Sequence, residues 1–194
     1  MQTLGLSDST PRTESRLKAL FWPTIRNEGD LDYVTQQGFW ICTIIGAFSL
    51  GAGILLRGVF GAFAIAEGLF YYLAGNGVRM RSRAAAVLAF SAYLLGGIVM
   101  QLRTGSGFGV LRIIFLALLA ANVRGIWLSA SWTRDPSEPP LVRLSDTWRD
   151  QLADQWPQRL WPKAKALFFA LAAIELLSLA LDLFPIVPAG SSVG

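Results

Sequence analysis

The sequence predicts an all-α integral membrane protein: a bundle of about five transmembrane helices with two interfacial amphipathic helices on its cytoplasmic surface. Three observations predict this class. Hydrophobic residues make up 53% of the 194-residue chain and charged residues only 15%, whereas soluble domains carry roughly 25% charged residues. The apolar residues gather into stretches of about 20 residues, the length that crosses a bilayer as a helix. Basic residues lie between these stretches, mostly in alternate loops.

Four of the predicted membrane helices follow one another along the chain. The first contains an uncharged run from Gly38 to Leu56, and the glycine-rich turn at its end leads directly into the second. Small residues recur at four-residue spacing in these helices, as at Ala64 and Gly68, a pattern that lets helices approach closely. The four helices are expected over residues 33–53, 58–78, 84–102 and 109–131, within the region 33–131.

A polar N-terminal segment precedes these helices. Residues 1–32 are expected to lie in the cytoplasm, and residues 13–22 within them are predicted to form a short amphipathic helix. Thr13 is the expected N-cap, and Pro23 ends the helix because proline cannot continue it. Such a helix lies in the headgroup plane of a bilayer.

A second polar stretch, residues 132–163, separates the fourth and fifth membrane helices and is expected in the cytoplasm. Its proline-rich beginning is typical of a loop. Ser145 is the expected cap of a second amphipathic helix that ends at Trp156, before Pro157, and carries an apolar side chain every four residues. The last two segments are a fifth membrane helix over 164–185 and a short external tail over 186–194.

The basic residues assign an orientation to this layout, because lysine and arginine gather in cytoplasmic loops of membrane proteins. With the N-terminus in the cytoplasm, thirteen basic residues fall on that side and only Arg57 and Arg103 on the other. The seven tryptophans, from Trp22 to Trp161, fall near the same face, as expected for an interfacial belt. We therefore expect an inner (plasma) membrane protein with a cytoplasmic N-terminus and an external C-terminus. The thirteen are Arg12, Arg16, Lys18, Arg26, Arg79, Arg81, Arg83, Arg134, Arg143, Arg149, Arg159, Lys163 and Lys165.

Composition argues against several function classes. The chain has no histidine, which removes the commonest general base and the commonest metal ligand. Its single cysteine, Cys42, cannot form an intramolecular disulfide, and no phosphate-binding glycine loop or metal-ligand spacing occurs. We therefore expect no cofactor, no metal and no enzyme activity. An intramembrane enzyme that uses the carboxylates of Glu67 and Glu175 stays a third alternative, which the missing histidine disfavours. The net charge of +4 is interpreted as basic cytoplasmic loops, and no nucleic acid is expected as a partner.

Five charged residues within the predicted membrane helices are the candidate functional residues. An ionised side chain at the centre of a span costs about 2.5–3.5 kcal/mol, so a charge retained there generally has a partner or a function. Glu67 and Glu175 lie near the middle of the second and fifth membrane helices. Arg124 lies in the cytoplasmic half of the fourth, whereas Arg112 and Asp182 lie near the opposite face.

Depth in the bilayer predicts which of these charges pair. The fourth and fifth helices run antiparallel, so Arg112 and Asp182 are expected at similar depth and are predicted to pair. Arg124 lies about 18 Å further in than Arg112, at 1.5 Å per residue, and is predicted to pair with Glu175 or Glu67. Paired charges hold helices together, whereas the alternative is a proton or ion path through the two acids.

On these grounds we expect a non-catalytic multi-pass membrane protein, a scaffold or accessory subunit that binds protein or lipid. Its expected partners are the lipid bilayer and, as a second class, other membrane subunits. The alternative function is that of a small transporter or ion-conducting protein, which would use Glu67, Glu175 and Arg124.

Overall fold

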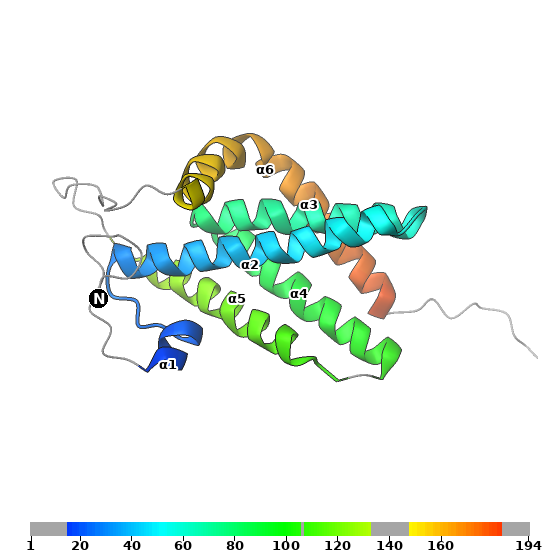
Figure 1. Cartoon of the computed structure of the whole chain (residues 1–194), viewed down its shortest axis with the longest axis horizontal. Helices are drawn as coiled ribbons and strands as arrows, with labels where there is room; N and C mark the ends of the chain where they lie inside the picture. The colour runs from blue at the N-terminus through cyan, green and yellow to red at the C-terminus, as the bar shows by residue number, and fades with distance from the viewer. Residues whose placement is uncertain (1–14, 106, 133–147, 184–194) are drawn as a thin grey trace, which may run out of the picture.

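The computed structural model describes residues 15–105, 107–132 and 148–183, and these residues form an all-helical bundle. This confirms the all-α class for the described part of the chain. Figure 1 shows α2 to α5 running along the bundle, each antiparallel to the next. The helices are α1 (Arg16–Phe21), α2 (Glu28–Leu55), α3 (Val59–Arg79), α4 (Arg83–Thr104), α5 (Val110–Ser129) and α6 (Trp148–Leu183).

Four of these helices are long and apolar enough to cross a membrane: α2, α4, α5 and the part of α6 over Gln151–Leu183. α3 has a similar length but is not among these four helices, and its sequence contains the polar residues Glu67 and Asn76. It packs against α2, α4 and α6, and its second half, including Phe70 and Tyr71, is buried. Since protein covers much of α3, this helix tolerates polar residues that a lipid-facing helix would not.

α2 and α3 form an antiparallel hairpin whose glycines let the two backbones touch. A methyl group added to Gly46 would lie 2.8 Å from the carbonyl oxygen of Gly68, and one added to Gly53 would lie 2.9 Å from that of Gly61. Both pairs repeat at seven-residue spacing, which is about two helical turns. Gly58, with a φ of 75°, forms the turn between the helices, a conformation that favours glycine.

The centre of the bundle is a group of aromatic rings where α3, α4 and α6 meet. Phe168 stacks on Phe70 with ring centroids 5.6 Å apart and lies 5.2 Å from the ring of Trp161. Trp161 is buried, so its indole packs inside the bundle, whatever its depth in the predicted interfacial belt. Its indole fills the space left by Gly77, where a methyl group would lie 2.5 Å from the ring atom Cη2.

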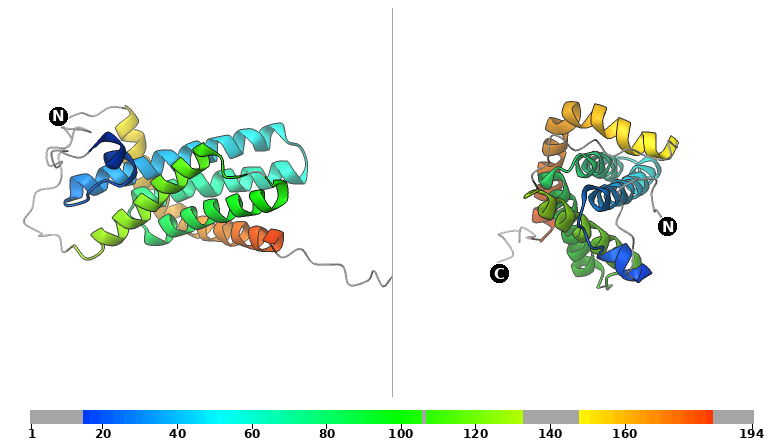
Figure 2. Two further views of the ribbon diagram at one scale, coloured as in Figure 1. Left: turned by 90° about the horizontal axis from the view of Figure 1, so that it is seen from below. Right: turned by 90° about the vertical axis from the view of Figure 1, so that its left-hand side faces the viewer.

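α6 is one helix that runs through Pro157 and Pro162, so the predicted helix end before Pro157 is wrong. The predicted cap Ser145 lies outside the described residues. Figure 1 shows the first, yellow part of α6 almost end-on, and the right-hand view of Figure 2 shows this part lying across the bundle before the orange part turns along it. Proline bends a helix because it removes a backbone donor and its ring crowds the preceding turn.

α1 is shorter than the helix predicted over 13–22. Its N-cap is Ser15, whose hydroxyl accepts a hydrogen bond from the backbone N–H of Lys18 at 3.4 Å. The predicted cap, Thr13, lies outside the described residues. The helix ends before Pro23, as the sequence predicted.

Candidate functional site

The two ends of the bundle differ in charge. At one end α2 begins, α3 ends, α4 begins, α5 ends and α6 starts, on the left in Figure 1. Arg79, Arg81 and Arg83 lie at this end, which we call the basic end. Arg57 and Arg103 lie at the other, which we call the opposite end. Two groups of polar side chains are candidate sites, one at the basic end and one between the long helices.

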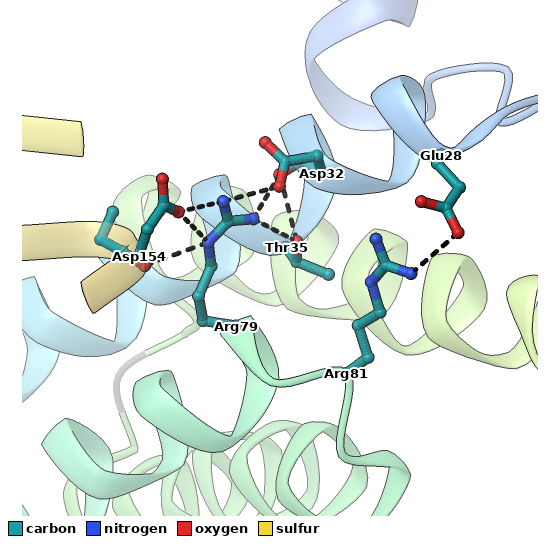
Figure 3. A network of polar contacts seen from close by, with 7 residues as sticks. Glu28, Asp32, Thr35, Arg79, Arg81 and Asp154 are labelled. Carbon is teal, nitrogen blue, oxygen red and sulfur yellow. Dashed lines mark hydrogen bonds and ion pairs between the residues drawn. The ribbon is translucent and has the colours of Figure 1, made fainter. Parts of the chain in front are cut away.

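Arg79, the last residue of α3, is the centre of the first group, which we call the Arg79 network (Figure 3). Its side chain is 7% exposed. Nη1 donates to the Thr35 hydroxyl at 2.9 Å and to the Asp32 carbonyl oxygen at 3.0 Å. Nη2 pairs with Asp32 Oδ1 at 2.6 Å and also with Asp154, and Nε donates to Asp154 Oδ1 at 3.0 Å.

The Arg79 network also explains how α6 is held where it bends. Nε of Arg79 donates to the carbonyl oxygen of Ala153 at 3.1 Å. In a regular helix this carbonyl would accept from the N–H four residues later, but that residue is Pro157, which has none. Arg79 therefore supplies a donor to the carbonyl that the proline leaves free, and it joins α6 to α2 and α3.

Sequence reasoning missed this network because it counted three nearby arginines only as positive charge. The structure gives each a different role: Arg79 is buried, Arg81 pairs with Glu28 at 3.6 Å, and Arg83 lies over the ring of Trp127 at 5.7 Å. A signal was present, since Asp32 and Asp154 lie at the same predicted membrane face as Arg79. Their pairing across long sequence separations depends on the fold.

The second group lies between the long helices, and we call it the membrane cluster. Its members come from each of α2 to α6 and include three of the five predicted site residues, the two acids and Arg112. The members are Ser49, Glu67, Tyr71, Tyr93, Arg112 and Glu175.

Glu67 and Arg112 connect most of the membrane cluster. The Glu67 carboxylate interacts with Ser49 and electrostatically with Arg112. Arg112 also interacts with Tyr93, and its guanidinium lies 5.2 Å from the centre of the Tyr93 ring. Tyr71, 1% exposed, packs edge-on against Tyr93 with centroids 6.1 Å apart.

Glu175 adds a second acid to the membrane cluster. It interacts electrostatically with Glu67, and Tyr71 interacts with both carboxylates. The cluster thus combines two carboxylates with one guanidinium, that of Arg112. Such a set serves either to bind helices to one another or to exchange a proton or a cation.

The structure corrects the predicted pairs of Arg112 and Asp182. Asp182 pairs with Arg103, at the end of α4. The physical reason is the helix order, because α6 packs against α3 and α4 rather than α5, which carries Arg112. Gly97 leaves room for the Arg112 side chain along α4, since a methyl group there would lie 3.0 Å from Nη1.

Arg124 likewise has different partners from those predicted. It was expected to reach Glu175 or Glu67, but its guanidinium lies 4.9 Å from the centre of the Trp22 ring. Its Nη1 donates to the carbonyl oxygen of Pro23 at 3.0 Å. The side chain therefore points toward the segment after α1 rather than into the membrane cluster.

These features define an all-helical bundle with four helices apolar enough to cross a membrane and with charged side chains in contacts between helices. In the described ranges, no three His, Cys, Asp or Glu residues are grouped so that they could hold a metal ion. No protein-family model matches the chain, and comparison with curated proteins and with solved structures gave no match.

Proposed function

We propose that this is a non-catalytic multi-pass membrane protein, a scaffold or accessory subunit that binds a partner protein or lipid at its basic end. One observation carries the proposal. The first part of α6 exposes a face formed by Trp148, Leu152 and Trp156, which we call the aromatic face, and Trp148 is 71% and Trp156 54% exposed. Ala153 and Pro157 are buried, which turns the aromatic face away from the bundle.

The Arg79 network supports a binding role for the aromatic face because it fixes this part of α6. Asp154 and the Ala153 carbonyl both bind Arg79, so the face is presented in one position. Tryptophan combines a large apolar ring with a polar N–H and is favoured at membrane interfaces and in protein contacts. A fixed aromatic face of this kind suits a docking role better than catalysis.

The proposal includes a membrane topology. We infer five spans with α3 among them, a location in the inner (plasma) membrane, a cytoplasmic N-terminus and an external C-terminus. The separation of Arg81 and its neighbours at one end from Arg57 and Arg103 at the other supports it, by the positive-inside rule. α1 and the first part of α6 are then the two interfacial helices.

Cysteine labelling tests this topology. In a Cys42→Ser background, a membrane-impermeant maleimide should label Arg81→Cys only in inverted vesicles and Arg57→Cys only in intact cells. Labelling of both positions from the same side would contradict the five-span topology.

Photo-crosslinking in native membranes tests the accessory role. A photoreactive residue at Trp148 or Trp156 should give a protein adduct of defined mass. The same residue at Phe60, which is exposed at the opposite end, is the control and should give only lipid adducts. Adding Arg79→Ala should lower the yield at Trp156, because the aromatic face loses its fixed position. Identical adducts at Trp156 and Phe60 would contradict the proposal.

The membrane cluster favours a second candidate function, that of a small transporter or ion-conducting protein. Two acids and one arginine lie between the packed helices. Arg112 takes the place that Arg124 held in the sequence-based set. In proteoliposomes with a pH-sensitive dye, an imposed gradient should then drive a flux that Glu67→Gln and Glu175→Gln each abolish. Asp182→Asn, which changes an exposed pair, is the control. No flux above empty liposomes would contradict this candidate.

A further inference from the structure

Two arginines at the basic end stack on tryptophans and have no carboxylate partner within the described residues. The guanidinium carbon of Arg83 lies 5.7 Å from the centre of the Trp127 ring, and that of Arg124 lies 4.9 Å from the centre of the Trp22 ring. Arg124 and Trp127 are three residues apart on α5 and so share a face of that helix. We call these four residues the Arg–Trp row.

The Arg–Trp row is held in place by the segment between α1 and α2. Ile25 packs against α5 at Gly125, where a methyl group would lie 3.0 Å from Ile25 Cδ1. Nη1 of Arg124 donates to the Pro23 carbonyl oxygen at 3.0 Å. These contacts keep Trp22 beside α5, although α1 and α5 are far apart in the sequence.

The positive charge of Arg83 is not balanced by a nearby carboxylate among the described residues. Both neighbouring arginines have carboxylate partners. Arg79 pairs with Asp32 and Asp154, and Arg81 pairs with Glu28. Arg83 is the first residue of α4, whose first turn contains no acidic residue. The N-terminus of a helix is the positive end of its dipole, which favours an anion near Arg83.

The geometry of the stacks leaves donors free for such an anion. A guanidinium stacked on an indole uses its flat face, so the N–H groups at its edge remain available to phosphate oxygens. Trp127 is 57% exposed, and Arg83 is exposed as well. The Arg83–Trp127 part of the row is therefore open to the surroundings of the bundle, and Arg124 is partly buried beside it.

The row also lies at the depth where lipid phosphates are found. Arg83 begins α4 and Trp127 lies in the last turn of α5, and both helices are apolar enough to cross a membrane. The ends of such helices lie near the headgroups, where tryptophan and arginine are favoured. Basic sites between membrane helices bind anionic lipid headgroups.

From these observations we propose that the Arg–Trp row binds the headgroup of an anionic phospholipid. Arg83 and Arg124 donate to the phosphate oxygens, and the indoles of Trp127 and Trp22 pack against the glycerol and upper acyl carbons. The proposal rests on the membrane placement proposed above and is independent of the accessory role.

Native mass spectrometry of the delipidated full chain in mild detergent tests the site. Titration should show tighter binding of phosphatidylglycerol than of phosphatidylcholine with the same acyl chains. Arg83→Gln and Arg124→Gln should each weaken phosphatidylglycerol binding about fivefold, and the double variant about thirtyfold, since each interfacial basic residue contributes about 1 kcal/mol. Phosphatidylcholine binding should not change.

A matched control removes the same charge at the opposite end. Arg57 is exposed, and Arg57→Gln should leave phosphatidylglycerol binding unaltered. Trp127→Leu keeps every charge but removes the ring under Arg83, and it should also weaken phosphatidylglycerol binding. This variant still tests the site if an arginine variant fails to fold. Equal weakening by Arg57→Gln, or no preference for phosphatidylglycerol, would overturn the proposal.

The identity of the anion and the membrane placement each have a separate readout. Complete displacement of the lipid by inorganic phosphate would show that the row recognises a free anion, and it would overturn the lipid assignment. Failure of every variant and of the unaltered protein to retain either lipid would overturn the site together with the membrane placement. A loss confined to the row variants supports the lipid site whether or not a partner subunit exists.

Discussion

Asp32 and Arg79 form an ion pair of 2.6 Å between Oδ1 and Nη2, and both side chains are largely buried. The pair joins the start of α2 to the end of α3. Asp154 of α6 binds the same guanidinium, so one arginine connects three helices. Removal of one member of a buried ion pair is strongly destabilising, because the remaining charge keeps its desolvation cost without a partner.

Arg79→Ala should therefore lower the free energy of unfolding by about 3 kcal/mol, because it leaves Asp32 and Asp154 without their common cation. Arg79→Lys should recover only part of this, since a lysine cannot reproduce the planar fork of donors. The measurement is equilibrium unfolding in mixed micelles. Arg81→Ala is the control, and its half-exposed pair with Glu28 should contribute less than about 1 kcal/mol. Equal losses for the two alanine variants would refute the structural role of Arg79.

The bend in α6 yields a second prediction. If Pro157 and Pro162 cause it, replacing both by alanine should straighten the helix, because each alanine restores a backbone donor. Spin labels at the exposed residues Leu152 and Leu167 report on this through the distance between them. That distance should increase toward the value of about 22 Å for fifteen residues of straight helix. An unchanged distance would mean that the Arg79 network, rather than the prolines, sets the bend.

The close approach of α2 and α3 yields a third prediction. Gly46→Ala should destabilise the protein by about 1–3 kcal/mol, because its methyl group would lie 2.8 Å from the Gly68 carbonyl oxygen and rigid backbone cannot yield. Gly51 is the control on the same helix, since nothing lies within 4 Å of a methyl group there. Gly51→Ala should be neutral or stabilising by up to about 1 kcal/mol, through its higher helix propensity. A loss of stability at Gly51 matching that at Gly46 would argue against the glycine contact.

Local sequence patterns predicted the positions of most helices. The predicted ranges 58–78 and 84–102 agree with α3 and α4 to within about two residues, because the length of an apolar stretch is a local property. The same reasoning failed at Pro157, where a terminator signal was expected to end a helix. A distant donor on Arg79 makes the interrupted backbone tolerable there, and nothing near Pro157 in the sequence reveals that donor.

Partners of the charged residues were harder to predict than the helices. The predicted pair of Arg112 and Asp182 depended only on their similar expected depth in the bilayer. Several charged residues share that depth, and which of them form a pair depends on which helices pack against each other. Because α4 packs against α6, Arg103 is the residue that meets Asp182. Glu67 and Glu175 were selected as candidates from their cost in hydrocarbon, while the contributions of Tyr93 and Ser49 carry no signal in an apolar sequence.

The charge composition of the membrane cluster yields a fourth prediction. Arg112→Met removes its single guanidinium and leaves Glu67 and Glu175 facing each other without a cation. This should destabilise the protein by about 3 kcal/mol, the approximate cost of an uncompensated charge in a membrane helix.

The double variant Arg112→Met with Glu67→Gln decides whether charge balance is the cause, because it removes one positive and one negative charge together. It should be more stable than Arg112→Met alone, an effect that independent sites would not show. Arg57→Met, at the opposite end, is the control and should have little effect on unfolding in micelles or on the response to Glu67→Gln. If the losses in unfolding free energy for Arg112→Met and Glu67→Gln are strictly additive, the two side chains are not energetically coupled. The residues of the membrane cluster would then be neighbours that do not stabilise one another.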